Sequence, residues 1–187
     1  MISRTRRRLL GSALVLPFVA RPAFGQSAPL THSCGKDTPR QTEGPFFTPK
    51  SPQRASLIEK DAPVDARFLL TGVVLSPQCK PIPGALVDFW HADQKGEYDN
   101  EGYRYRGHQR TDAQGRYRLE TIVPGLYPGR TRHFHVKVQA PGGGRVLTTQ
   151  LYFPGEPANQ RDGIYRPDLE VKTGKPAEGS FDFVVAA

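Results

Sequence analysis

The chain has 187 residues, 37% of them hydrophobic, which suits one compact domain and excludes two large ones. It contains 19 glycines and 18 prolines, a turn-rich balance that favours short strands over long helices. The formal net charge is +8, but five of the 26 basic residues and none of the 18 acidic residues lie in residues 1–25. The remainder has 21 basic and 18 acidic residues, a net charge of +3, without a basic stripe or aromatic platform. We therefore expect no nucleic-acid partner.

Residues 1–25 have the three-part layout of an export signal: a basic start, an apolar run from Leu9 to Ala20, and a small-residue region near Gly25. The apolar run is too short to span a bilayer, so no stable membrane insertion is expected after signal removal. The segment 5–10 (TRRRLL) places adjacent arginines before a leucine pair, which favours the twin-arginine route over an ordinary secretory signal. The sequence thus predicts a periplasmic or secreted protein.

The chain has two cysteines, Cys34 and Cys79. Neither has a spacing typical of metal sites. In an oxidising compartment the pair can form a disulfide that ties the N-terminal segment to the core, and this is favoured over two free thiols.

After the signal, the chain divides into an arm and a strand-rich domain. Residues 26–67 are polar, proline-rich and without periodicity, which predicts an extended N-terminal arm. Residues 68–187 contain short apolar or alternating segments separated by glycine and proline turns. These segments predict strands at residues 68–75, 85–90, 116–122, 132–139, 146–153 and 181–185. Such spacing predicts an all-β domain, an antiparallel β-sandwich with long loops.

One predicted strand contains His133-Phe134-His135. Successive side chains in a strand alternate faces, so both imidazoles point the same way and can chelate one metal ion. A lone pair of this kind is more often hydrogen-bonded or surface histidine, so the metal hypothesis needs support from its surroundings.

Two tyrosines in nearby loops supply that support. Tyr127 is the bulky residue between the breakers of residues 124–129, and Tyr98 lies in the segment 96–99. The commoner fate of each is simple packing. Together with the two histidines, however, they offer two phenols and two imidazoles.

This donor set indicates a particular metal. A phenol has a reference pKa of about 10, so it binds as an anion only to a strongly Lewis-acidic cation. Zn(II) more usually takes Cys, His and carboxylate, and Fe(II) oxygenases more usually take two His and one carboxylate. Two phenols and two imidazoles therefore favour Fe(III), which would activate an electron-rich organic substrate rather than O₂ directly.

The stretch from Thr71 to Phe153 resembles the intradiol ring-cleavage dioxygenases, which include catechol 1,2-dioxygenases and protocatechuate 3,4-dioxygenases. The matching segments are 81–85 (PIPGA), 87–92 (VDFWHA), 96–98 (GEY), 111–117 (TDAQGRY), 124–128 (PGLYP), 130–135 (RTRHFH) and 147–153 (LTTQLYF), with 42–46 (TEGPF) in the arm. Their order and spacing agree with the family over most of the chain that follows the signal.

The resemblance implies four ligands for an Fe(III) cofactor, of which the equatorial pair is Tyr98 and His133 and the axial pair is Tyr127 and His135. Tyr103 and Tyr105 are rivals for the first tyrosinate. The Gly-x-Tyr context of Tyr98 matches the family better.

The resemblance also implies catalytic roles. Arg130 would stabilise negative charge on the bound ring, and Tyr127 would take up a substrate proton. Arg132 is the rival of Arg130, but as a strand residue next to a ligand it should face away. Gln150 would hydrogen-bond the ring or the arginine. The residues implied to lie against the substrate are Gly44, Pro45, Arg130 and Gln150.

The reaction implied is cleavage of a catechol-type ring by O₂, between its two hydroxyl-bearing carbons, to a muconate-type diacid. The partners are thus a small aromatic diol and O₂. The chain lacks the long helical dimerisation region of catechol 1,2-dioxygenases, so a homo-oligomer is an open alternative to a monomer.

The competing interpretation is a non-enzymatic exported binding module. The turns of this chain also resemble those of transthyretin-like and adhesin-like β-sandwiches. Such modules need the strands and turns, but they do not need the histidine pair, Arg130 or Gln150. These residues favour the enzyme.

Overall fold

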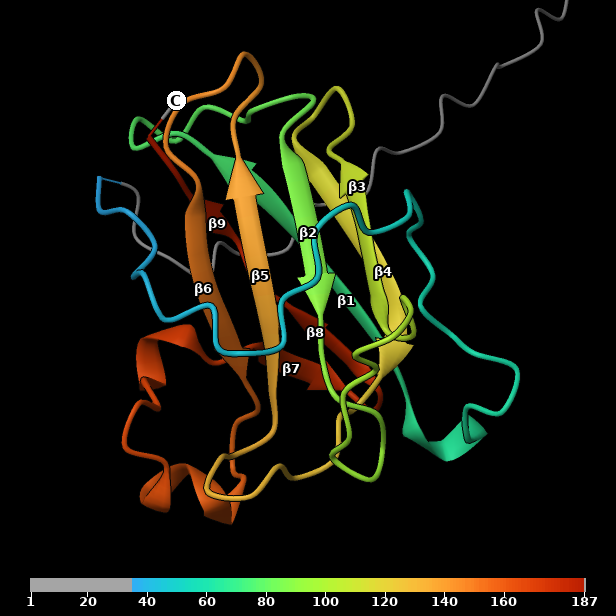
Figure 1. Ribbon diagram of the computed structural model, residues 1–187. Helices are drawn as coiled ribbons and strands as arrows, with labels where there is room; N and C mark the ends of the chain where they lie inside the picture. Colours follow the sequence, from blue (N-terminus) through green and yellow to red (C-terminus); the bar gives the residue numbers. More distant parts are fainter. Residues whose placement is uncertain (1–34, 187) are drawn as a thin grey trace, which may run out of the picture.

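Two β-sheets packed face to face make up the computed structural model, which describes residues 35–186 (Figure 1). One sheet has the order β3-β2-β5-β6, and the other has the order β4-β1-β8-β7 with β9 paired to β1. The strands are β1 (Arg67–Leu75), β2 (Leu86–Trp90), β3 (Arg106–Arg110), β4 (Arg116–Ile122), β5 (His133–Gln139), β6 (Leu147–Tyr152), β7 (Lys172–Lys175), β8 (Glu178–Ser180) and β9 (Phe183–Val184). Three short 3₁₀ helices are η1 (Val64–Ala66), η2 (Pro157–Arg161) and η3 (Pro167–Leu169).

The predicted all-β sandwich is confirmed, and each of the six predicted strands is present with bounds within two residues. Strands β3, β7 and β8 were not predicted, because their sequences are polar or glycine-containing and show no apolar alternation. One of the two sheets is mixed, since β1 pairs antiparallel with β4 but in parallel with β8 and β9. Parallel pairing requires a long connection between the two strands. Such a connection exists here, because β1 lies near the start of the domain and β8 and β9 lie near its end.

The export signal and Cys34 lie outside the described residues. In the part of the chain that the structure describes, no helix is long and apolar enough to span a bilayer.

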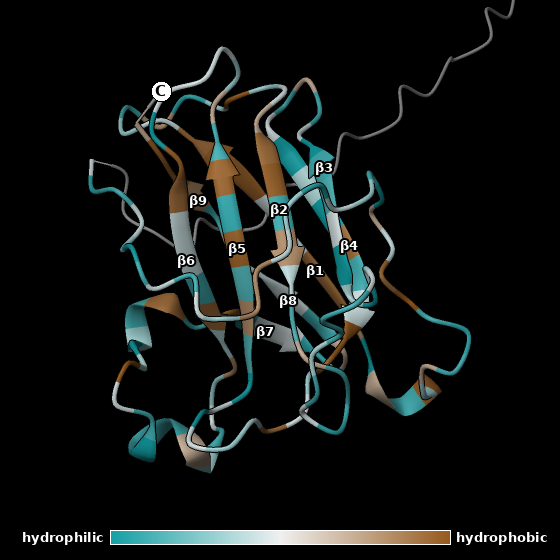
Figure 2. Cartoon of the chain, in the orientation of Figure 1, coloured by the Kyte–Doolittle hydropathy of each residue, from teal (hydrophilic) through white to brown (hydrophobic). Residues whose placement is uncertain are grey.

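Alternate side chains of the strands point inward and fill the space between the two sheets. Phe134, Val136 and Val138 of β5 are fully buried in the core, together with Val87 and Phe89 of β2. Figure 2 shows the apolar and polar residues alternating along β5. The other face of this sheet therefore carries the side chains between them, including those of the predicted site.

The arm covers that outer face. The chain that leads up to η1 crosses in front of β6, β5 and β2 (Figure 1). Its backbone is hydrogen-bonded to the sheet at both sides, from Gln41 N to Thr148 O and from Arg54 N to His108 O, each at 2.9 Å. Between them, Lys137 of β5 forms an ion pair with Glu43. The predicted extended arm is thus a layer packed on the sheet.

The hydroxyl of Tyr117 in β4 links the sandwich to the C-terminal segment, and its removal tests how much this buried contact stabilises the fold. Tyr117 is 3% exposed, and its hydroxyl donates to the Phe181 carbonyl oxygen at 2.7 Å. Tyr117→Phe should lower the free energy of unfolding by about 1–2 kcal/mol, because a buried carbonyl loses a donor. Urea unfolding would measure it.

The control is Tyr103→Phe, because the Tyr103 hydroxyl also donates to a carbonyl, that of Pro49, but the side chain is 39% exposed. This change should stay within about 0.5 kcal/mol. Equal losses in the two variants would contradict the assignment of Tyr117 as a buried anchor.

Candidate metal centre

The two histidines of the predicted site project from the outer face of β5, with Phe134 between them pointing into the core. The pairing register places His135 opposite Trp90 of β2 and Gln150 of β6. The indole ring of Trp90 stacks on the His135 imidazole, with centroids 4.9 Å apart and 8° between the planes. The imidazoles are therefore held in place by strand pairing and ring stacking, and they do not depend on a loop.

Tyr98 and Tyr127 come from two loops whose backbones pack directly against each other. A Cβ atom on Gly96 would lie 2.0 Å from a carbonyl oxygen of the other loop, and one on Gly125 would lie 2.3 Å from another. Such distances allow only glycine at both positions. The glycines of the two sequence motifs thus let the phenol rings approach to 6.1 Å between centroids.

Three potential metal donors converge at the outer face of β5. The Tyr98 hydroxyl lies 3.2 Å from His133 Nε2, which in turn lies 3.1 Å from His135 Nε2. His133 Nδ1 lies 2.6 Å from the Thr131 carbonyl oxygen and donates to it, so the Nε2 lone pair faces the other donors. Two ligands bound at right angles to one ion at about 2.1 Å would lie about 3 Å apart. The three atoms have the spacing of adjacent ligands of one metal ion.

The rival tyrosines point elsewhere. The Tyr103 hydroxyl binds the Pro49 carbonyl, and the buried Tyr105 ring packs on His91 with centroids 5.0 Å apart. The geometry therefore favours Tyr98 as the first phenol. Among the described residues, no three His, Cys, Asp or Glu side chains form a group that could hold a metal, so no carboxylate completes a site with the two histidines there.

Burial keeps the donors uncharged in the absence of a cation. Desolvation lowers the pKa of His133 to about 4 and that of His135 well below the usual range, and it raises the pKa of Tyr98. The imidazoles are thus neutral and the phenol keeps its proton near pH 7. A cation that binds here must displace that proton, so its affinity should rise with pH.

The arm forms one wall of the centre. The Phe46 ring stacks on Tyr98, with centroids 4.4 Å apart and 16° between the planes. Gly44 has a φ angle of +72°, and a Cβ atom there would lie 3.2 Å from Cε1 of His135. Pro45, between them, is exposed. The structure thus brings Gly44 against a predicted ligand and leaves Pro45 at the surface.

The two arginines before His133 bind different partners, although Arg132 lies just before β5 and not within it as the sequence predicted. Arg130 Nη2 donates to Gln150 Oε1 at 2.5 Å, and Gln150 Nε2 donates to the Thr42 carbonyl at 3.0 Å. Arg132 Nε instead donates to Glu156 at 2.8 Å. Arg130 and Gln150 are therefore neighbours in one network, to which Arg132 does not belong.

A buried arginine that sequence reasoning missed joins the arm to the Tyr98 loop. Arg106 of β3 is 1% exposed, and its guanidinium donates to the Asp99 carbonyl at 2.6 and 3.0 Å and to the Phe46 carbonyl at 2.6 Å. The acceptors are main-chain carbonyls, so no pattern of residue types in the sequence indicates these contacts. Arg106 also lies in β3, a strand that the sequence did not predict.

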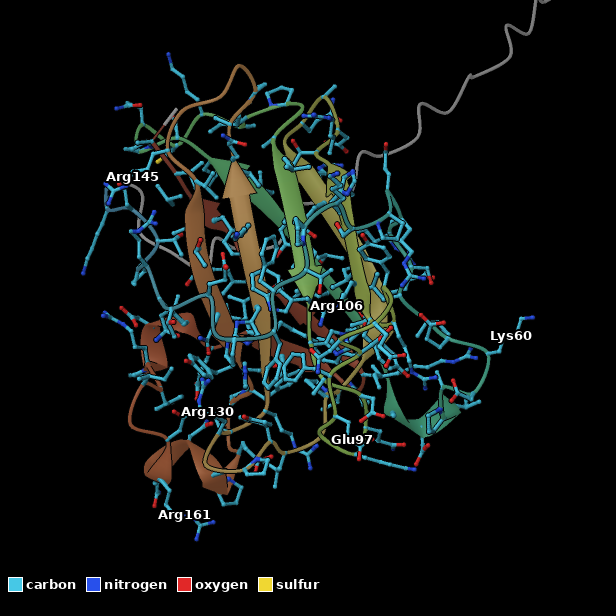
Figure 3. The ribbon with its side chains drawn as sticks, in the orientation of Figure 1. Lys60, Glu97, Arg106, Arg130, Arg145 and Arg161 are labelled. Carbon is cyan, nitrogen blue, oxygen red and sulfur yellow. The ribbon has the colours of Figure 1, made fainter. Side chains whose placement is uncertain are left out.

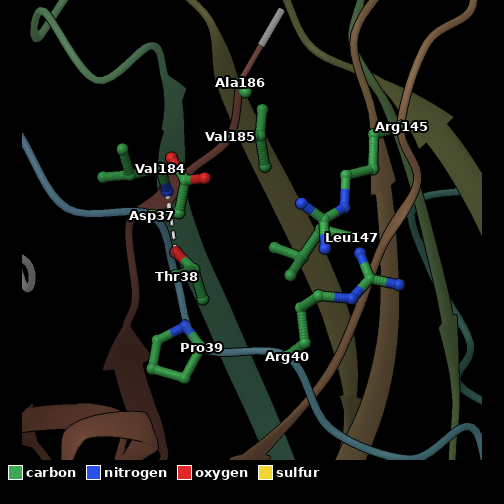
Figure 4. A pocket seen from close by; sticks show the side chains of 9 residues that line it. All are labelled: Asp37, Thr38, Pro39, Arg40, Arg145, Leu147, Val184, Val185 and Ala186. Atoms are coloured by element: carbon green, nitrogen blue, oxygen red, sulfur yellow. Dashed lines mark hydrogen bonds between the residues drawn. The ribbon is translucent and has the colours of Figure 1, made fainter.

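A separate cavity of about 270 Å³ lies beside the C-terminal segment, and Arg40, Arg145 and Val184 are among the residues that line it (Figure 4). In Figure 3, Arg145 lies at the other end of the molecule from Arg130. The cavity contains none of the residues predicted for the site, so it is not part of the candidate metal centre.

The fold is thus a β-sandwich whose outer face brings the Tyr98 hydroxyl and the imidazoles of His133 and His135 together. A sequence profile described as Dioxygenase matches residues 42–177. The chain belongs to the intradiol dioxygenase family.

Named relatives agree with this membership. The protocatechuate 3,4-dioxygenase beta chain of Burkholderia cepacia is 33% identical over 126 residues, which cover 58% of this chain and 54% of the relative. The catechol 1,2-dioxygenase of Acinetobacter baylyi is 30% identical over 156 residues, which cover 68% and 50%. The chain thus spans about half the length of these curated relatives.

One solved structure matches this chain over nearly the whole of its own length. It is the dioxygenase domain of a dioxygenase carbohydrate-binding protein fusion from the cellulolytic bacterium Streptomyces sp. SirexAA-E. It is 53% identical, with a TM-score of 0.76, and the match covers 81% of this chain and 99% of that one.

The buried imidazoles predict acid sensitivity of the metal-free protein. His91 is also buried, and desolvation lowers its pKa to about 4. Below pH 6.5 the unfolded chain binds protons that the folded chain excludes, so stability falls as the pH drops toward 4. By pH 5.5, His91 and His133 should each lower the stability by about 1 kcal/mol, and His135 should lower it further. Urea unfolding of metal-free protein at pH 7.5 and 5.5 would measure this, and unchanged stability would contradict it.

Proposed function

We propose that the chain is a non-haem Fe(III)-dependent intradiol dioxygenase, which inserts both atoms of O₂ into a catechol-type ring to give a muconate-type diacid. The observation that carries the proposal is the convergence of Tyr98, His133 and His135, whose donor atoms are 3.1 and 3.2 Å apart. Family membership supports the reaction class. The names of the relatives, catechol 1,2-dioxygenase and protocatechuate 3,4-dioxygenase, support an aromatic diol as substrate.

The donor chemistry supports ferric iron as the cofactor. Two phenolates are hard anionic donors that suit a trivalent ion, and neutral imidazoles complete the set. The residues that would hold the ion are Tyr98, Tyr127, His133 and His135. When bound, Fe(III) would supply a Lewis acid that lowers the pKa of the catechol hydroxyls and makes the ring reactive toward O₂.

The surrounding residues have separate tasks in this proposal. The Arg130 guanidinium is always charged, so it stabilises negative charge on the ring, and Gln150 holds it in place at 2.5 Å. Tyr127, whose ring centroid lies 6.1 Å from that of Tyr98, would help to hold the ion and would accept a substrate proton. The arm residues Gly44 to Phe46 cover one side of the substrate.

Iron-loaded protein should be red to burgundy from charge transfer between tyrosinate and Fe(III), and it should consume O₂ with a catechol. His133→Ala should lose the iron, and Tyr127→Phe should weaken the colour. The measurements are metal content, the visible spectrum and O₂ uptake with catechol, protocatechuate, hydroxyquinol and larger catechols.

Matched controls come from the same residue types outside the centre. His108→Ala and Tyr103→Phe should keep the iron and the colour, because His108 Nδ1 contacts Ser51 and Tyr103 contacts the arm. A colourless wild-type protein that holds zinc or no metal would sink the proposal and favour a non-enzymatic binding module.

We also propose that residues 1–25 direct export by the twin-arginine route, and that Cys34 and Cys79 pair in the oxidising compartment. A fusion of residues 1–25 to a reporter that is exported only when folded should leave the cytoplasm. Replacement of Arg6, Arg7 and Arg8 by lysine keeps the charge but should abolish this export. Export that persists in the lysine variant would identify an ordinary secretory signal.

A further inference from the structure

Asp162 is a buried carboxylate that belongs to none of the sequence motifs. It follows η2, and its side chain is 1% exposed. A buried charge is costly unless it is paired and hydrogen-bonded, so its contacts indicate what it stabilises.

Asp162 binds two consecutive residues of the segment that precedes His133. Its Oδ2 accepts hydrogen bonds from Arg130 Nε at 2.9 Å and from the backbone N–H of Thr131 at 3.0 Å. Its Oδ1 accepts one from Ile164 N at 3.1 Å. Burial raises the pKa of Asp162, but the N–H donors and the Arg130 guanidinium together outweigh this effect and lower it. The carboxylate is thus ionised near pH 7.

The contact with Arg130 complements the one from Gln150. Asp162 holds the guanidinium at Nε, and Gln150 holds it at Nη2, at 2.5 Å. A flexible side chain fixed at two of its nitrogens has one orientation toward the centre. Without Asp162, only the contact at Nη2 would remain of this pair.

The contact with Thr131 reaches the metal side of the site. The carbonyl oxygen of Thr131 accepts from His133 Nδ1 at 2.6 Å, and its hydroxyl donates to Asn159 at 2.6 Å. The position of Thr131 therefore determines the tautomer and tilt of the imidazole. Hydrogen-bond partners of this kind orient metal-binding histidines and tune their basicity.

We propose that Asp162 is a positioning residue that aligns Arg130 and His133 as one unit, so that the charge facing the substrate and the nitrogen facing the metal share one anchor. The roles of these two residues rest on the proposed function. The alignment itself does not, because the contacts exist without metal.

The chain supplies a matched control two residues after Arg130. Arg132 forms the same type of ion pair with Glu156, at 2.8 Å, from the same connection after β6. Its guanidinium also donates to the Pro124 carbonyl, and it does not join the network of Arg130 and Gln150. Asp162→Asn therefore removes the carboxylate partner of Arg130, inside the proposed unit. Glu156→Gln removes the carboxylate partner of Arg132, outside it.

The first test uses metal-free protein and nuclear magnetic resonance. In the wild type, the Nε–H proton of Arg130, assigned with Arg130→Lys, should exchange slowly with water, unlike that of the exposed Arg161. Asp162→Asn should make it exchange fast, and Glu156→Gln should not. Fast exchange in the wild type overturns the proposal, even if Asp162→Asn fails to fold.

The second test is kinetic, at saturating iron. Asp162→Asn should lower kcat/KM for a catechol by about 10–100-fold, as expected for a lost partner of a metal-site residue. Glu156→Gln should stay within about twofold. If Asp162→Asn keeps the wild-type kcat/KM and slow exchange, Asp162 positions nothing. A wild-type protein without ring cleavage would defeat the proposed function, while the exchange measurement would still decide the role of Asp162.

Discussion

The alternation of side chains along β5 is the constraint on which the rest of the structure depends. One strand presents Phe134 and Val136 to the core and His133 and His135 to the outer face. A slip of one residue in its pairing with β2 or β6 would bury the imidazoles in the core and expose the phenyl ring. The hydrophobic effect that fixes the register of β5 therefore also fixes the candidate metal site.

The centre is prepared for a cation before one is bound. Its imidazoles are neutral and its first phenol is protonated because the surroundings exclude water. The separations among the Tyr98, His133 and His135 donors are already those of neighbouring ligands. At these three residues, binding would thus require loss of the Tyr98 proton rather than a large movement of the chain, which couples metal affinity to pH.

The sequence predicted the parts of the site that depend on local patterns. Strand alternation is local, so the shared face of the histidine pair followed from three consecutive residues. The loop of Tyr127 followed from its glycine and proline residues, whereas Tyr98 was chosen on the family resemblance of its Gly-x-Tyr motif; the structure explains both glycines by close backbone contact. Asp162 and Arg106 could not be found in this way. Asp162 binds residues 31 and 32 positions away, and Arg106 binds a carbonyl 60 positions away, so only the folded chain reveals their partners.

The arm belongs to the site rather than merely covering it. Arg106 binds the carbonyls of Phe46 in the arm and of Asp99, the residue after Tyr98. If the arm moved away, a nearly fully buried guanidinium would lose an acceptor, which costs more than the bond itself contributes. The Phe46 ring would also leave the face of Tyr98. The loop that carries the first phenol and the segment that walls the centre are thus held by one cation, so neither can be displaced without a cost to the other.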